Sequence, residues 1–163
     1  MKVNHTLKPI YDSNSKVLIL GSMPSVKSRE LMFYYANPNN RFWKIFEILF
    51  NTRFNDVDGK IKFLLNNNIA LWDTIKSCDI KSSYDSTIKN IEVNDINSLI
   101  HKTNIKYIFC TGNKSYEIYN KYIYDKTKIK PILLLSPSSA NAKYNIDDLV
   151  NNYKIIKEKL SII

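Results

Sequence analysis

The feature that most constrains the fold of this chain is an alternation between short apolar runs and longer segments with helical spacing. The apolar runs resemble strands that are covered on both faces, because they are short and almost continuously hydrophobic. They lie at residues 16–20, 69–71, 106–110 and 131–135. Since strands that alternate with helices form parallel sheets, the pattern predicts an α/β fold, a three-layer αβα sandwich around a four-stranded parallel sheet.

The segments between and after these runs carry apolar residues every three or four positions, the spacing of one helix face. The clearest example is the last, where Asn145 can cap a helix with an apolar face. That face consists of Ile146, Leu149, Val150, Tyr153, Ile156 and Leu160. Further helices are predicted over residues 41–50, 58–67, 95–103 and 113–124, and right-handed crossovers would place helices on both faces of the sheet.

The length and charge of the chain narrow its class. A chain of 163 residues fits a single domain over residues 1–163, because domains commonly span about 100–200 residues. The net charge of +9 favours a polyanionic partner such as nucleic acid, although a soluble lysine-rich surface accounts for the charge equally well. The first apolar run is too short for a signal core or a membrane span, so we expect a cytoplasmic protein with no membrane partner.

Several familiar sites are excluded by residue spacing. Cys78 and Cys110 are isolated and lack CxxC spacing, which argues against a zinc site or an iron–sulfur cluster. His5 and His101 lie on unrelated segments, so no metal is predicted. The three glycines are too scattered for a dinucleotide fingerprint, and the segment after Gly112 lacks the spacing of a P-loop.

Three segments of unusual composition follow predicted strands. They are Gly21-Ser22-Met23-Pro24-Ser25, Thr111-Gly112-Asn113-Lys114-Ser115 and Ser136-Pro137-Ser138-Ser139-Ala140-Asn141. Parallel sheets bind ligands at the carboxyl ends of their strands, and small residues there let backbone N–H groups approach a ligand. We assign Gly21 to such an approach, whereas Gly112 is explained as well by the needs of a strand-to-helix turn.

A cluster of aromatic and amide side chains follows the first of these segments. It reads Tyr34-Tyr35-Ala36-Asn37-Pro38-Asn39-Asn40-Arg41-Phe42-Trp43. A hydrophobic core accounts for Phe42 and Trp43, but not for a tyrosine pair followed by a loop with three asparagines. Aromatic rings and amides are the groups that stack on a nucleic-acid base and read its edge.

With these elements together, the sequence resembles the uracil-DNA glycosylase superfamily, above all its mismatch-specific and DNA-deoxyinosine glycosylase branches. Four elements, in the family's order, carry the resemblance across most of the chain. They are residues 21–25, residues 34–43, Ala70-Leu71-Trp72-Asp73 with Cys78 and Asp85 downstream, and residues 136–142. The resemblance implies removal of deaminated bases, hypoxanthine or uracil, from DNA by a monomer that uses neither a cofactor nor a metal.

The chain departs from the uracil-removing members of that family at two positions. Met23 stands where they place an aspartate or asparagine, and Ser136 stands where they carry a histidine. The deoxyinosine branch fits better, because its Tyr-Tyr-x-x-Pro-x-Asn-x-Phe-Trp pattern supplies an asparagine that maps onto Asn40. Many members have a histidine before the proline, where this chain has Asn37, so base preference stays open.

The resemblance and the chemistry of base excision together suggest a role for each element. Asn40 would be catalytic, holding the attacking water through its amide oxygen, by positioning rather than by proton removal. Backbone N–H groups around Gly21, Ser22, Met23 and Ser25 would stabilise the departing base, as an oxyanion hole does. Tyr35, or else Tyr34, would stack on the flipped base, and a glycosylase without lyase activity is expected.

The third strand-end segment is predicted to contact DNA. Its hydroxyl and N–H groups suit phosphate oxygens, and the predicted contacts are Ser136, Pro137, Ser138, Ser139, Ala140, Asn141 and Lys143. Asp85 is a candidate base-binding carboxylate and Asp73 a weaker one, since each residue could instead cap a turn or helix. Two rivals remain: a DNA-binding module of the same fold without catalysis, and a nucleoside or nucleotide hydrolase.

Overall fold

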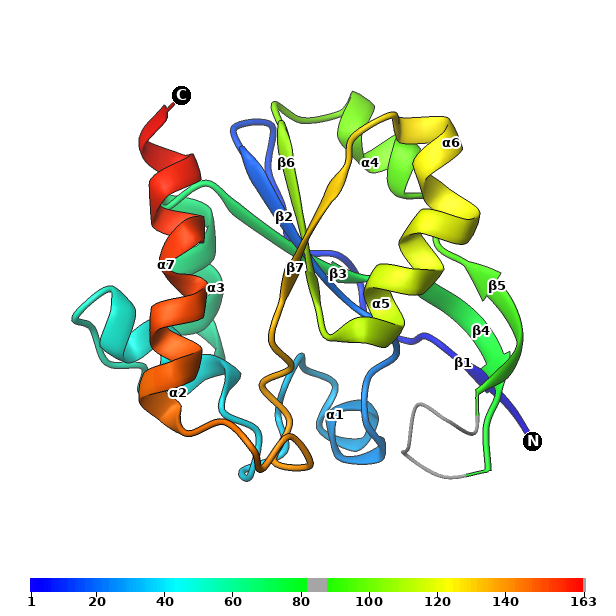
Figure 1. Ribbon diagram of the computed structural model, residues 1–163, viewed down its shortest axis with the longest axis horizontal. Coiled ribbons are helices and arrows are strands. Elements are labelled where there is room, and N and C mark those ends of the chain that lie inside the picture. Colours follow the sequence, from blue (N-terminus) through cyan, green and yellow to red (C-terminus); the bar gives the residue numbers. More distant parts are fainter. Residues whose placement is uncertain (82–87, 163) are drawn as a thin grey trace.

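A computed structural model describes residues 1–81 and 88–162 of the chain. In that part of the chain, the largest sheet has four strands, all parallel, in the order β3-β2-β6-β7 (Figure 1). These strands are β2 (Val17–Gly21), β3 (Ile69–Asp73), β6 (Tyr107–Thr111) and β7 (Pro131–Leu134). Each contains most or all of one predicted apolar run, so the four-stranded parallel sheet is confirmed.

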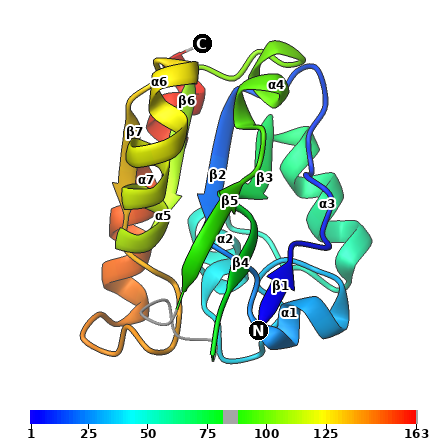
Figure 2. The ribbon, with the colours of Figure 1, turned by 90° about the vertical axis from the view of Figure 1, so that its right-hand side faces the viewer.

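Helices cover both faces of this sheet, which confirms the predicted three-layer sandwich (Figures 1 and 2). One face carries α2 (Phe42–Leu49), α3 (Val57–Asn66) and α7 (Ile146–Ile162). The other carries α4 (Ile96–His101), α5 (Asn113–Ile118), a π-helical turn η2 (Tyr119–Ile123) and α6 (Tyr124–Thr127). A short helix that was not predicted, α1 (Val26–Leu31), lies at the end of the molecule where β2 finishes.

The alternation of side chains along β2 explains why both faces need cover. All five residues of this strand are buried. Val17 and Ile19 pack into the core beneath α2 and α7, whereas Leu18 and Leu20 pack into the core on the α4 side. Successive strand side chains point to opposite faces, and burying each one stabilises the fold by about 1.5–3 kcal/mol.

Three predicted helices begin at side-chain caps. The Asn145 side chain accepts from the Asp148 N–H, and the Asp148 carboxylate accepts from the Asn145 N–H in return. Asp56 caps α3 and Asp95 caps α4 in the same manner. Such caps satisfy N–H groups that have no partner inside the helix. No helix in the described part of the chain is long and apolar enough to span a lipid bilayer.

A second sheet, which the sequence analysis did not predict, flanks the end of β3. It is antiparallel and consists of β1 (Lys2–Asn4), β4 (Ile75–Asp79) and β5 (Lys89–Val93), in the order β1-β4-β5. Its strands alternate buried and exposed residues instead of forming apolar runs, so a search for continuous hydrophobic segments passes over them. This sheet brings the amino-terminal segment to the carboxyl end of β3 (Figure 2).

Candidate active site

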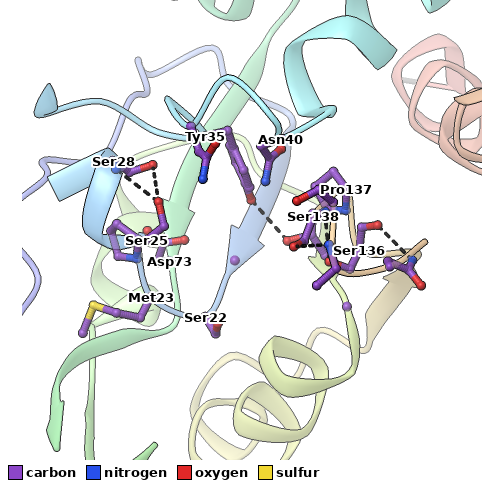
Figure 3. Close-up of a pocket in the computed structure, with 18 of the residues that line it drawn as sticks. Ser22, Met23, Ser25, Ser28, Tyr35, Asn40, Asp73, Ser136, Pro137 and Ser138 are labelled. Carbon is purple, nitrogen blue, oxygen red and sulfur yellow. Dashed lines mark hydrogen bonds between the residues drawn. The ribbon is translucent and has the colours of Figure 1, made fainter. Parts of the chain in front are cut away.

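A pocket opens at the carboxyl ends of the parallel strands, the place where such sheets bind ligands. Its lining comes from residues 21–30, the tyrosine segment at 34–40, Asp73 at the end of β3, and residues 133–144 after β7. Figure 3 shows Tyr35 and Asn40 reaching into it from one side. The structure therefore brings together the elements that were singled out from the sequence.

Gly21 is the position where the pocket floor comes closest to its neighbours. A Cβ atom on Gly21 would lie 2.5 Å from Oδ1 of Asp73 and 3.0 Å from the hydroxyl of Tyr35. Any larger residue would push these two groups apart. The prediction that Gly21 permits a close approach is therefore supported, and the groups it admits are the carboxylate and the phenol.

Gly112 also meets a specific requirement of the backbone. It has a φ of +90°, a conformation that residues with a Cβ rarely adopt, and its N–H donates to the Leu134 carbonyl. A Cβ here would lie 3.3 Å from that of Ser136. Gly112 thus serves the strand-to-helix turn, as expected, and also lets the segment after β7 pack closely.

A chain of serine hydroxyls joins the first strand-end segment to the tyrosine segment. The Ser25 side chain caps α1 by accepting from the Ser28 N–H, and its hydroxyl donates to the Ser28 hydroxyl. The Ser28 oxygen in turn accepts from the Ala36 N–H. Ser28 is buried, so these bonds hold the residue that follows Tyr35 in a fixed position.

Tyr35 is held in place from three directions. One face of its ring stacks on Phe42, with centroids 3.9 Å apart and an interplanar angle of 9°. Its hydroxyl donates to Thr111, whose own hydroxyl is directed at the Leu20 carbonyl. Its backbone is left-handed, with a φ of 52°, which is uncommon outside glycine and is typical of functional sites.

Tyr34 and Tyr35 have different surroundings, which settles the choice between them. Tyr34 is only 3% exposed, and its hydroxyl donates to the Lys8 carbonyl. Although it touches the pocket, Tyr34 therefore belongs mainly to the core, and Tyr35 is the ring that extends into the cavity (Figure 3). Burial, reinforced by the negative charge of Asp73, raises the pKa of both phenols well above the usual value, so both stay protonated.

The amide of Asn40 has a fixed orientation. Its oxygen accepts from the Phe42 N–H at 2.9 Å, at the beginning of α2. Its backbone N–H donates to the Asn37 carbonyl. An amide oxygen has two lone pairs, so one remains for a further donor, while the NH₂ group points away from the helix.

The segment after β7, here called the serine loop (residues 136–141), is anchored by Arg41. The guanidinium donates to the carbonyls of Tyr144 at 2.6 Å, Ser138 at 2.8 Å and Asn141 at 3.1 Å. The Arg41 backbone N–H donates to the Pro137 carbonyl as well. Sequence analysis did not assign any role to Arg41, because its acceptors lie about 100 residues further along the chain.

The serine loop itself divides into a buried and an exposed part. Pro137 is buried, so it shapes the loop rather than its outer surface, in contrast to its predicted DNA contact. Ser139 and Ala140 are exposed beside the pocket, as is Lys143 beyond the loop. The exposed residues remain available for the contacts predicted for them.

Met23 lies at the pocket, but its side chain packs away from it. The side chain contacts the small core of the second sheet, which includes Ile75 and Cys78. Figure 3 shows the sulfur directed away from Tyr35 and Asn40. Only the backbone of Met23 can therefore serve the pocket in the way the sequence analysis predicted.

Asp73 and His5 form a buried pair that sequence analysis did not detect. Nε2 of His5 lies 2.8 Å from Oδ2 of Asp73, and their side chains are 2% and 5% exposed. His5 was set aside as an isolated histidine, and the residues are 68 positions apart, so no local pattern relates them. The Asp73 side chain caps no described turn or helix. Asp85 lies outside the described residues.

Comparison with known proteins places this geometry in a family. The family model described as "Uracil DNA glycosylase superfamily" matches residues 9–158. The chain belongs to the uracil DNA glycosylase superfamily. The recognition made from the sequence is thereby confirmed, and with it the class of enzyme, a DNA glycosylase that hydrolyses N-glycosyl bonds.

Individual relatives of this glycosylase come from methane-producing archaea. The chain is 33% identical to the hypoxanthine DNA glycosylase of Methanosarcina acetivorans over 141 residues, covering 83% of this chain and 87% of that protein. It is 32% identical to the hypoxanthine DNA glycosylase of Methanosarcina barkeri, covering 83% and 86%. A solution NMR structure of a candidate uracil DNA glycosylase from Methanosarcina acetivorans superposes with a TM-score of 0.79 at 28% identity, covering 96% of this chain and 99% of that one.

Proposed function

We propose that this glycosylase removes deaminated bases from DNA, with hypoxanthine as the principal substrate and uracil as a second one. The observation that carries the proposal is the pocket, in which Tyr35, Asn40 and Asp73 converge at the ends of the strands. An aromatic ring, an amide and a carboxylate suit a flipped base better than a sugar phosphate. The naming of both archaeal relatives as hypoxanthine DNA glycosylases supports the choice of base.

In this proposal the flipped base stacks on Tyr35. One face of the ring is covered by Phe42, so the ring is already rigid before DNA binds. Stacking on a fixed ring costs little conformational entropy, and base–aromatic stacking is worth about 1–3 kcal/mol. The backbone N–H groups of Ser22, Met23 and Ser25 then stabilise the negative charge that develops on the departing base.

Asn40 holds the attacking water. The Phe42 N–H occupies one lone pair of the amide oxygen and fixes its direction, which leaves the second lone pair to accept from water. An amide is a poor base, so Asn40 acts by positioning. Departure of the base leaves a sugar cation that needs little activation of its nucleophile. No lysine is required to attack the sugar, and strand cleavage does not follow.

The serine loop and Lys143 contact the DNA backbone around the flipped nucleotide. Ser139 and Ala140 are the loop residues most exposed to a partner. Hydroxyl and N–H donors on a rigid loop position the phosphates, and the net charge of +9 strengthens the attraction. The loop is rigid because the Arg41 guanidinium binds its carbonyls.

The test is base release from labelled duplexes that carry hypoxanthine, uracil or only normal bases, with alkali to reveal abasic sites. Wild type should release hypoxanthine, and Asn40→Ala should release it about 100-fold more slowly, the usual consequence of a displaced reactant. Asn39→Ala is the matched control, because its exposed side chain is the neighbouring amide and makes no bond to α2. Asn40→Asp keeps the acceptor for the Phe42 N–H and should retain activity.

The outcomes separate this proposal from its rivals. Equal release by wild type and Asn40→Ala would keep the glycosylase and move the water site elsewhere. Binding of every duplex without release would favour a DNA-binding module that lacks catalysis. Release from free deoxynucleosides, together with DNA binding that hardly depends on salt, would indicate a small-molecule hydrolase.

A further inference from the structure

The buried pair of His5 and Asp73 lies at the floor of the pocket, and the site chemistry described so far does not use it. Asp73 is the last residue of β3, directly opposite Gly21 in the register of the parallel sheet. Oδ1 of Asp73 lies on the Gly21 side, near the Tyr35 hydroxyl, while Oδ2 faces His5. Figure 3 shows Asp73 across the pocket from the serine loop, with the tip of Tyr35 between them.

The protonation pattern of His5 follows from its two neighbours. Nδ1 of His5 accepts from the Leu7 N–H at 3.2 Å, so this nitrogen carries a lone pair. The proton of the neutral ring is therefore on Nε2, where it is donated to Oδ2 of Asp73. The histidine backbone is held too, because its N–H donates to the Lys76 carbonyl in the second sheet.

A donor on one side of Asp73 determines what the other side offers. The His5 proton occupies Oδ2, so the free direction of the carboxylate is that of Oδ1, toward the pocket. An ionised carboxylate can only accept hydrogen bonds. The pocket floor therefore presents a fixed acceptor, and a base placed there must offer an N–H group.

We propose that Asp73, oriented by His5, selects bases that carry a proton on the ring nitrogen next to the exocyclic oxygen. This inference rests on the proposed glycosylase function and adds the group that recognises the substrate. Hypoxanthine and uracil both have this ring N–H. Adenine and cytosine, from which they arise by deamination, have a lone pair there, which the carboxylate repels. The pair thus detects the chemical change that deamination makes.

The decisive variant is Asp73→Asn. The Nε2 proton of His5 still requires an acceptor, so the new amide places its oxygen toward His5 and its NH₂ group toward the pocket. The floor changes from acceptor to donor. Release of hypoxanthine should fall about 10- to 100-fold, as expected for losing a hydrogen bond to a charged group, and release of adenine should rise relative to it.

Removing His5 from this variant supplies a test that a purely structural role would not pass. In the double variant His5→Ala/Asp73→Asn, no donor fixes the amide, which can turn its oxygen back toward the base. Hypoxanthine release should therefore recover above that of Asp73→Asn alone. His5→Gln is the conservative control, because its amide nitrogen can replace Nε2 as donor and should preserve selectivity for hypoxanthine.

Thermal unfolding of each variant would show whether it is folded, and a modified substrate tests the idea in the unaltered protein. A duplex with 1-methylhypoxanthine lacks the ring proton, so wild type should release that base far more slowly than hypoxanthine. Equal release of the two bases, or unchanged selectivity in folded Asp73→Asn, would overturn the role of Asp73 while leaving the glycosylase in place. Failure of wild type to release any base would instead refute the proposed function itself.

Discussion

Arg41 offers the most direct test of how the pocket is assembled, because one side chain joins two segments that the sequence keeps far apart. Its guanidinium makes three hydrogen bonds of 3.1 Å or less to carbonyls of residues 138–144. Arg41→Met keeps most of the aliphatic packing and removes all three bonds. A hydrogen bond to a charged group contributes about 1.5–3 kcal/mol. Since Arg41 is half-buried and water can replace part of this, we expect a loss of about 3 kcal/mol in the free energy of unfolding.

The functional consequence should differ from the stability effect. The serine loop is the proposed DNA contact, so loosening it should weaken binding more than it slows chemistry. We expect the KM for a hypoxanthine duplex to rise at least about tenfold, which corresponds to 1.4 kcal/mol, with kcat nearly unchanged. Arg41→Lys should be intermediate, because a single ammonium cannot span three carbonyls as a planar fork does.

Urea unfolding and steady-state base release measure the two effects separately. The matched control is Arg53→Met, which removes the same charge from an exposed position. If Arg41→Met unfolds at the same urea concentration as Arg53→Met and binds the duplex equally well, the guanidinium does not organise the loop. The argument from the four segments converging on one pocket would then lose its main support.

Two further predictions concern the pocket floor and the core. Gly21→Ala should lower activity at least about tenfold and destabilise the fold by about 1–3 kcal/mol, because its Cβ would meet the clamped carboxylate of Asp73 at 2.5 Å; Gly59→Ala, within α3, should be neutral or stabilising by urea unfolding. Burial raises the pKa of Tyr119 to about 12. Above pH 10 the unfolded chain loses this proton first, so stability should fall with a slope that Tyr119→Phe reduces, up to about 2–3 kcal/mol between pH 10 and 12. A pH series of urea curves that shows identical slopes for both proteins would contradict this.

Much of the fold was accessible from the sequence because it depends on local patterns. The apolar runs at residues 16–20 and 106–110 could only be buried strands, and their alternation with helical segments required a parallel sheet. The cap at Asn145 could be read from the amide and the apolar face that follows it. The tyrosine segment and the serine loop were found because their composition is unusual for a core.

Parts of the candidate site were not accessible, because they depend on the path of the chain rather than on neighbours in sequence. Whether Tyr34 or Tyr35 lines the cavity depends on a left-handed backbone at residue 35 and on packing against Phe42. The strands of the second sheet have no continuous apolar signal, and their pairing fixes their position.

The sequence by itself therefore determined the class of fold, the end of the sheet that binds a ligand, and the residue types available there. Only the tertiary structure decided which of these residues meet. His5 reaches Asp73 because an amino-terminal strand pairs with β4, and Arg41 reaches the serine loop because α2 begins beside the end of β7. Hydrogen bonds between groups 68 or 97 residues apart leave no periodicity in the chain, since each partner satisfies its own local pattern equally well without the other.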